Sequence, residues 1–234
     1  MIRRTVAAAS AFRPLLLAAL AYAALVAPAS AATDKSAPAK TAATMTPKVA
    51  SAARTEVAIF AMGCFWCGET QFEQQPGVLT VISGFAGGPE KNPTYEQVSN
   101  GQTGHYEAIQ ITFDPTKTSY AKLLDLFWHG IDPTQGDGQF CDRGAQYRSA
   151  VFYMSTGQRD LAESSKKKLI EWGMIKAPIV TQVLPATPFW PAEEYHQDFW
   201  KKDPIRYRSY RLGCGRDARL KKLWGDQAAK PLVH

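Results

Sequence analysis

The sequence predicts an α/β or α+β fold in which helices pack on one sheet. Hydrophobic runs of strand type and of helix type alternate along the chain, which is typical of such folds. Of the 234 residues, 45% are hydrophobic and 21% are charged, as in an ordinary globular protein. The part after residue 54, about 180 residues, is long enough for one well-buried core and too short for two comfortable domains.

Residues 1–31 have the layout of a secretory signal peptide. A basic start with Arg3 and Arg4 precedes an apolar run from Pro14 to Val26, and the small residues Ala29–Ala31 form a cleavage site. The apolar run is shorter than the ~20 residues that a membrane span needs. We therefore expect cleavage after the last alanine of this site, a periplasmic or secreted protein, and no stable membrane anchor.

Residues 32–54 are predicted to form a flexible linker, because they are rich in Ala, Thr, Ser, Pro and Lys and have almost no large apolar side chain. The folded domain is expected over residues 55–226, with a tail over 227–234. The formal net charge of +6 comes from the region before residue 55, which holds seven basic residues and one acidic residue. The rest of the chain is neutral overall, so no nucleic-acid partner is expected.

The domain begins with a strand–helix–strand pattern. Val57–Met62 is a continuous apolar run of strand length, which predicts a buried strand. Helical spacing follows over residues 64–74, and Pro76 ends it. The stretch over 76–104 is rich in glycine and proline, so it is predicted to form long loops around a short strand at Val78–Ser83.

Strands and helices continue to alternate in the second half of the domain. Apolar patterning predicts strands over Tyr106–Phe113, Ser149–Met154 and Ile179–Leu184. Helical spacing of apolar residues predicts helices over Ser119–His129 and Gln158–Trp172. The C-terminal part, rich in aromatic residues and proline, is predicted to wrap the core as coil with short helices.

The four cysteines, Cys64, Cys67, Cys141 and Cys214, point to the chemistry of the chain. Two structural disulfides would suit an exported protein, but a domain of this size does not need them. Haem attachment requires C-x-x-C-H, and Gly68 occupies the position of the histidine. A structural zinc site would require a second pair of closely spaced ligands. No metal site is therefore expected.

Cys64 is the predicted nucleophile. It follows a buried strand and a glycine, and it stands at the first turn of a predicted helix. There the helix dipole stabilises a thiolate and would lower the thiol pKa from its usual value of about 8.5. Two other interpretations stay open at this point: a periplasmic thiol–disulfide oxidoreductase that uses Cys64 and Cys67, and a binding module held together by disulfides.

A longer set of motifs surrounds these cysteines. Gly63-Cys64-Phe65-Trp66 is followed by Glu69, and further stretches come in a fixed order: Ser83–Gly88, Asn92–Tyr95, Gly104–Glu107, Asp142–Arg148 and Glu194–Asp198. From about residue 56 to 225, the sequence resembles the peptide methionine sulfoxide reductases of the A type.

The resemblance implies a two-layer sandwich with a ferredoxin-like core and long wrapping loops. It also implies the reduction of methionine-S-sulfoxide, in oxidised proteins and as the free amino acid, to methionine by attack of Cys64 on the sulfoxide sulfur. Electrons would arrive by thiol–disulfide exchange from a thioredoxin-like reductant, so no cofactor is expected. A monomer is expected.

The resemblance also assigns the remaining site residues. Glu107 would be the general acid that protonates the leaving oxygen, a role worth about 10²–10⁴ in rate. The hydroxyls of Tyr95 and Tyr147 would bind the sulfoxide oxygen, and Asp142 would be a polar partner in the same pocket. The pair Phe65–Trp66 would hold the S-methyl group. Without the resemblance, Glu107 would be interpreted as an exposed strand carboxylate and the aromatic residues as packing residues.

The recycling step requires a second thiol. After the attack Cys64 is left as a sulfenic acid, which a thiol within reach converts to a disulfide. Cys214 is favoured for this role, because flanking glycines give its chain freedom and because the family commonly keeps recycling cysteines in its C-terminal part. Cys67 and Cys141 would then be structural thiols or relay steps. A resting disulfide between Cys141 and Cys214 is the alternative.

Overall fold

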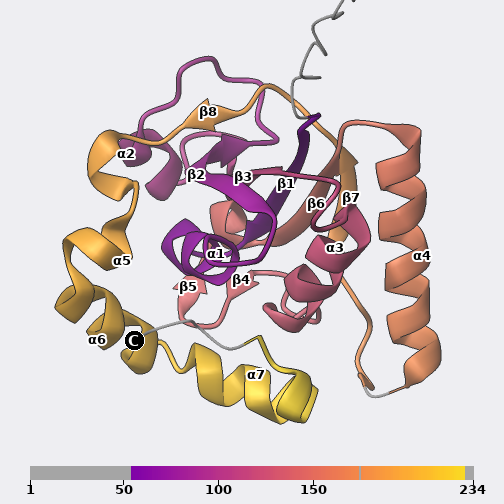
Figure 1. Cartoon of the computed structure of the whole chain (residues 1–234). Helices are drawn as coiled ribbons and strands as arrows, with labels where there is room; N and C mark the ends of the chain where they lie inside the picture. The colour runs from indigo at the N-terminus through magenta and orange to yellow at the C-terminus, as the bar shows by residue number, and fades with distance from the viewer. Residues whose placement is uncertain (1–53, 174, 230–234) are drawn as a thin grey trace, which may run out of the picture. The chain divides into compact units, whose positions relative to one another are not determined.

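A six-stranded mixed sheet lies at the centre of the protein (Figure 1). The structure is a computed structural model, and it describes residues 54–173 and 175–229. These residues belong to one compact unit. The predicted signal peptide and nearly all of the predicted linker lie outside the described residues. Within the described ranges, every helix is too short or too polar to cross a bilayer.

The strand order in the sheet is β7-β6-β1-β3-β2-β8. The strands are β1 (Glu56–Met62), β2 (Val78–Ala86), β3 (Tyr106–Phe113), β6 (Ser149–Tyr153), β7 (Gln182–Pro185) and β8 (Trp190–Pro191). All neighbours are antiparallel except β6 and β7. β1 and β2 are therefore parallel with β3 between them, which is the split β-α-β arrangement of a ferredoxin-like core.

Helices and short turns connect the strands. They are α1 (Phe65–Phe72), α2 (Tyr95–Ser99), α3 (Tyr120–His129), α4 (Thr156–Trp172), α5 (Phe199–Lys202), α6 (Pro204–Gly213), α7 (Arg216–Trp224) and the 3₁₀ turns η1 (Ala145–Tyr147), η2 (Glu194–His196) and η3 (Gly225–Gln227). A separate hairpin is formed by β4 (Gly138–Gln139) and β5 (Asp142–Arg143). Ser119 and Ser155 begin α3 and α4, because each hydroxyl accepts a hydrogen bond from a backbone N–H of the first turn.

Alternate side chains of β1 enter two separate parts of the core. Phe60 faces α1 and α3, where its ring centroid lies 5.7 Å from that of Phe72 and 4.9 Å from that of Phe127. Ile59 faces the opposite side of the sheet, in a cluster that Leu184 and Phe189 border. Both faces of the strand are covered, which explains why its sequence is a continuous apolar run rather than an alternating one.

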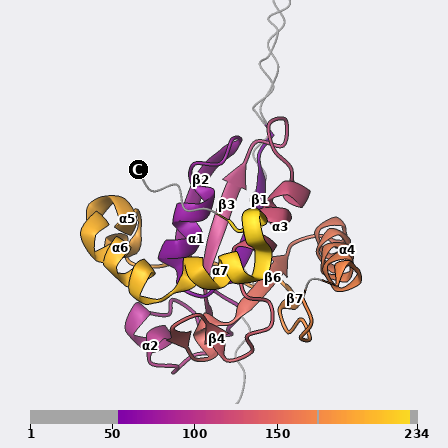
Figure 2. The ribbon, with the colours of Figure 1, turned by 90° about the horizontal axis from the view of Figure 1, so that it is seen from below.

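The main differences from the sequence prediction lie in β2, in β7 and in the C-terminal part, and α2 forms in a stretch predicted as loop. β2 continues to Ala86, past the residues predicted as its end, because Gly84 pairs with both β3 and β8. A Cβ at this glycine would lie 2.3 Å from the carbonyl oxygen of Trp190. The third predicted strand of the second half begins at Gln182 rather than Ile179. The C-terminal part contains more helix than predicted, since α5, α6 and α7 follow one another along one side of the unit (Figure 2).

Candidate active site

A small pocket lies at the start of α1, where segments from the whole domain meet. Its lining residues are Cys64, Phe65, Trp66, Tyr95, Glu107, Asp142, Tyr147 and Tyr210. All of them except Tyr210 were predicted from the sequence. The pocket has a volume of about 70 Å³, and on this measure one water molecule needs about 10–15 Å³. It therefore has room for a group of a few heavy atoms.

The turn between β1 and α1 places Cys64 in this pocket. Gly63 has a φ of +79°, and a Cβ there would lie 2.6 Å from the Cβ of Gln139, so this position requires glycine. Cys64 is the N-cap of α1, and its carbonyl oxygen accepts hydrogen bonds from the N–H groups of Cys67 and Gly68. The side chain is buried, with 6% of its surface exposed.

The thiols of Cys64 and Cys67 are hydrogen-bonded to each other. The hydrogen bond from Cys64 lowers the pKa of Cys67 to about 6, and the guanidinium groups of Arg216 and Arg211 act in the same direction. Burial raises the pKa of Cys64, and Cys67, Glu107 and Asp142 raise it further. The expectation that the helix dipole would lower the pKa of Cys64 is therefore wrong for this structure. Burial and the neighbouring thiol and carboxyl groups favour the neutral thiol of Cys64.

Glu107 is buried in β3, with 2% of its surface exposed. Its Oε2 accepts a hydrogen bond of 3.1 Å from the backbone N–H of Phe65. Burial raises the pKa of Glu107 to about 8. The carboxyl group is therefore mostly protonated at neutral pH, and it faces the pocket as a proton donor. The alternative of an exposed strand carboxylate is excluded.

Two tyrosines and one aspartate complete the polar side of the pocket. Tyr95 begins α2, and its backbone N–H donates to Glu193 Oε1 at 2.9 Å. Burial raises the pKa of Tyr95 to about 12 and also raises the pKa of Tyr147, so both hydroxyls keep their protons and can donate hydrogen bonds. Burial also raises the pKa of Asp142, which lies in β5.

The apolar side of the pocket is a wall of aromatic rings. Trp66 is stacked on Phe199, with ring centroids 3.9 Å apart and an interplanar angle of 12°. The indole N–H of Trp66 donates to Nδ1 of His196 at 3.2 Å. Burial lowers the pKa of His196 to about 4, so the imidazole is neutral and its Nδ1 is free to accept this bond. The ring of Phe65 lies 5.0 Å from that of His196.

The sequence prediction missed Tyr210, which reaches the pocket from α6. Its hydroxyl donates to Asp142 Oδ2 at 2.5 Å, and its ring meets that of Trp66 edge to face at 5.8 Å. The region was predicted mainly as coil. The spacing of Tyr207, Tyr210 and Arg211 is helical, but no sequence pattern indicates that Tyr210 contacts Asp142.

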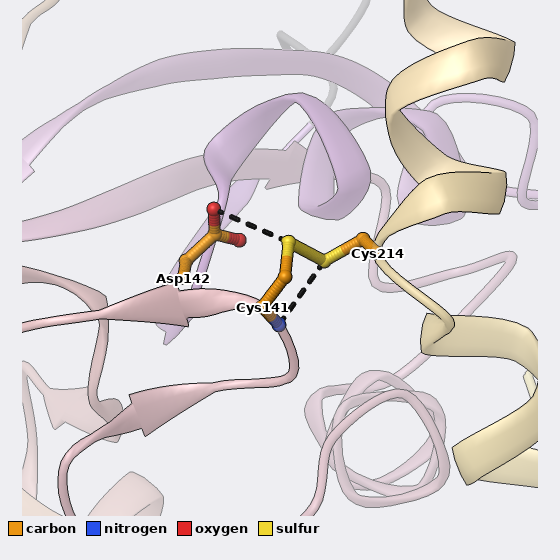
Figure 3. Close-up of side chains that lie close together, drawn as sticks. All are labelled: Cys141, Asp142 and Cys214. Carbon is orange, nitrogen blue, oxygen red and sulfur yellow. Dashed lines mark hydrogen bonds between the residues drawn. A yellow bond between two sulfur atoms is a disulfide. The ribbon is translucent and has the colours of Figure 1, made fainter.

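Cys141 and Cys214 form a disulfide, with Cα atoms 4.9 Å apart (Figure 3). This pairing is the one that was considered as an alternative. Cys64 and Cys67 are free and buried. The role predicted for Cys214, condensation with the sulfenic acid of Cys64, stays a prediction.

Two side-chain clusters among the described residues have metal-ligand atoms close together. In the first, the sulfurs of Cys141 and Cys214 are bonded to each other and have no free thiolate. The second contains Glu69, Glu73 and Asp198. There the Lys201 ammonium is paired with two of the carboxylates. Both clusters are explained without a metal.

Comparison with known proteins gives one consistent family. The family model described as peptide methionine sulfoxide reductase matches residues 56–228. The peptide methionine sulfoxide reductase MsrA of Bacillus licheniformis is 57% identical over 174 residues, which is 74% of this chain and 96% of that protein. MsrA 2 of Rhizobium meliloti is 49% identical over 185 residues, which is 79% of this chain and 91% of that protein.

Two solved structures are also similar. Methionine sulfoxide reductase A of Corynebacterium diphtheriae is 34% identical, with a TM-score of 0.58 over 64% of this chain and 76% of that chain. Mxr1 from Saccharomyces cerevisiae in its reduced form is 30% identical, with a TM-score of 0.60 over 65% of this chain and 88% of that chain.

Proposed function

Because this chain belongs to the peptide methionine sulfoxide reductase family, we propose that it reduces methionine-S-sulfoxide to methionine with Cys64 as the nucleophile. One observation supports this most directly: a buried cysteine and a protonated carboxyl group, Glu107, line the same small pocket. Reduction of a sulfoxide needs both groups, since the sulfur must be attacked and the oxygen must be protonated to leave.

The pair Cys64 and Cys67 begins the reaction. Because the thiol of Cys64 donates a hydrogen bond to Cys67, the proton of Cys64 passes to Cys67 as the Cys64 sulfur attacks the sulfoxide sulfur. Glu107 protonates the oxygen, while the hydroxyls of Tyr95 and Tyr147 donate hydrogen bonds to it. The oxygen atom is transferred to the Cys64 sulfur. The products are methionine and a sulfenic acid on Cys64.

We propose that Cys67, rather than the Cys214 favoured from the sequence, resolves this sulfenic acid. It lies one helical turn from Cys64 and is hydrogen-bonded to it, whereas the sulfur of Cys214 is bonded to Cys141. Condensation of the Cys67 thiol with the sulfenic acid forms a Cys64–Cys67 disulfide and releases one water molecule. A dithiol reductant of the thioredoxin class then supplies two electrons and two protons, which restores both thiols.

The pocket explains which part of the substrate is recognised. The pocket is small, and we propose that the S-methyl sulfoxide end of the side chain enters it. The methyl group lies against the wall formed by Phe65 and Trp66, and the oxygen faces Glu107 and the tyrosines. The backbone of the substrate stays outside the pocket, so both protein-bound and free methionine sulfoxide can be substrates.

The export signal supports a role outside the cytoplasm. The basic, apolar and small-residue regions of residues 1–31 predict a cleavable signal peptide. We propose that the enzyme repairs oxidised methionines of exported proteins in the periplasm or outside the cell. It would act there as a monomer.

The test is epimer-resolved reduction of methionine sulfoxide by the purified protein with a dithiol reductant. Wild-type protein should consume the S epimer, Cys64→Ser should consume neither epimer, and the exposed helix variant Ser209→Ala should equal wild type. A preference for the R epimer would contradict the proposal. So would strong insulin reduction without sulfoxide turnover, which would favour a thiol–disulfide oxidoreductase.

A further inference from the structure

The Cys141–Cys214 disulfide and one active-site hydrogen bond join the same two segments. Cys141 precedes Asp142 in the β4–β5 hairpin, and Cys214 is the C-cap of α6 (Figure 3). The N–H of Cys214 donates to the carbonyl oxygen of Tyr210 at 2.8 Å. The hydroxyl of Tyr210 in turn donates to Asp142 at 2.5 Å. The disulfide, two hydrogen bonds and the chain itself therefore form a closed ring that includes a pocket carboxylate.

Helix α6 is anchored on its buried side, where the Arg211 guanidinium pairs with Asp217, and the ring of Tyr210 contacts Trp66. Tyr207 and Arg211 are its buried side chains. Ile205 and Leu212, which could anchor the helix by burial, are 77% and 83% exposed. Beyond Arg211 the last residues of the helix are exposed or half-buried, so packing does not hold this end of α6. A covalent link four residues after Tyr210 does restrict it.

We propose that the Cys141–Cys214 disulfide holds the end of α6 against the β4–β5 hairpin, and that it thereby makes Tyr210 a positioning residue for Asp142 in the active site. This inference rests on the proposed function of the pocket. It assigns the disulfide to the oxidised, resting enzyme rather than to the catalytic cycle. The first turnover then uses the electrons of Cys64 and Cys67 alone.

The chemistry of Asp142 supports this assignment. The Cys141 sulfur lies 3.7 Å from Asp142 Oδ1, but a disulfide sulfur has no hydrogen to donate, so Tyr210 is the donor that orients the carboxylate. Reduction by a dithiol adds two electrons and two protons and leaves thiols on Cys141 and Cys214. The new Cys141 thiol is then a second donor beside Asp142, while α6 loses its covalent link. Activity should therefore fall when this disulfide is reduced.

The hydroxyl of Tyr210 also stabilises the ionised form of Asp142, so its removal should raise the pKa of Asp142. The titratable and charged groups around this carboxylate are Cys64, Tyr95, Glu107, Tyr147, Tyr210 and Arg216. Loss of the hydroxyl would move the Asp142 titration to higher pH. A purely structural defect would lower the rate at all pH values alike.

The experiment measures the first turnover of the purified protein, with one equivalent of methionine-S-sulfoxide and no added reductant. Thiol titration and peptide mapping first establish that Cys64 and Cys67 are reduced while Cys141 and Cys214 are bonded. Tyr210→Phe should slow methionine formation about tenfold, the effect of one lost hydrogen bond to a charged group, and should shift the pH profile. The control Tyr153→Phe changes a tyrosine of β6 away from the pocket and should equal wild type.

The double variant Cys141→Ser/Cys214→Ser separates positioning from recycling. It should slow the first turnover as much as Tyr210→Phe does, with the same shift in pH profile, and the triple variant should be no slower than either. A wild-type first turnover in the double variant would overturn the proposal. If the double variant also stops after one turnover with a thioredoxin-type reductant, Cys214 is the recycling thiol.

A measurement without substrate distinguishes this proposal from the proposed function. Amide hydrogen exchange in α6 should accelerate when the Cys141–Cys214 disulfide is reduced, while exchange in β1 and β3 stays constant. Unchanged exchange in α6 would overturn the positioning role. If exchange accelerates and wild-type protein reduces no sulfoxide, the link between α6 and the hairpin stands and the proposed function fails.

Discussion

The two cysteine pairs of this protein differ in sequence separation, in burial and in bonding state. Cys64 and Cys67 are three residues apart, buried and free, on a helix that follows a core strand. Cys141 and Cys214 are 73 residues apart and bonded, and they lie between a hairpin and a helix end. Cys141 is exposed and Cys214 is half-buried.

The difference shows that the surroundings of each cysteine, rather than the residue type, decide whether it takes part in chemistry or in structure. The hydrogen bond from Cys64 and the charges of Arg216 and Arg211 lower the pKa of Cys67 against the effect of burial, so the first pair holds a reactive, shared proton. The second pair has no free thiol, and its bond connects two segments that both reach the pocket. We therefore expect the buried pair to control chemistry and the surface pair to control geometry and stability.

The largest effect should come from removing the partner of Cys64. Cys67→Ser should form at most about one methionine per enzyme, and slowly, because neither the proton acceptor nor the resolving thiol is present. Cys214→Ser should continue to cycle. Methionine formed per enzyme measures both, with a thioredoxin-type reductant instead of a small dithiol, because a small dithiol would reduce the sulfenic acid directly. The opposite result, with Cys67→Ser cycling and Cys214→Ser stopping after one turnover, would restore the recycling role predicted for Cys214.

Glu107→Gln should slow the first turnover by about 10²–10⁴, because the amide keeps the shape of the carboxyl group and cannot deliver a proton. Single-turnover methionine formation measures this rate, and alkylation of Cys64 by iodoacetamide should still proceed. Glu163→Gln, an exposed position on α4, is the matched control. A variant rate equal to that of wild type would remove Glu107 from the mechanism.

The pH dependence of the first turnover should have two limbs. Glu107 must be protonated, so the rate should fall about tenfold per pH unit as pH rises above about 8. Cys67 must be ionised to accept the proton of Cys64, so the rate should also fall as pH decreases below about 6. Stopped-flow rates across the range test both limbs. Persistence of the alkaline limb in Glu107→Gln would assign it to another group.

Reduction of the Cys141–Cys214 disulfide should have the smallest effect on the reaction rate and the clearest effect on the stability of the fold. Loss of a cross-link that closes a 73-residue loop should destabilise the folded domain by about 4 kcal/mol in the chain-entropy model. Urea unfolding of the Cys64→Ser/Cys67→Ser variant, with and without reductant, measures the contribution of the disulfide to the free energy of unfolding. In a background that also lacks Cys141 and Cys214, the reductant should change nothing. Equal midpoints in the first background would show that the disulfide does not stabilise the domain.

The sequence by itself determined the parts of the molecule that depend on neighbouring residues. The apolar run Val57–Met62 is β1 apart from one residue, and Tyr106–Phe113 coincides with β3. The signature around Cys64 indicated the family, and the motif resemblance indicated seven of the residues that line the pocket. The strands follow from local periodicity and residue type, which are visible without a fold. The pocket residues follow from the resemblance to the family.

Only the tertiary structure decided the charge state of Cys64, the partner of Cys214 and the place of Tyr210. The local helix dipole predicted a low pKa for Cys64, but burial and carboxyl groups from distant strands raise it. Cys214 pairs with Cys141, and Tyr210 reaches Asp142, across 73 and 68 residues of sequence. A pKa depends on every charge and on the solvent within a few ångströms, and a disulfide depends on the approach of two Cα atoms. Neither quantity is encoded in the spacing of residues along the chain.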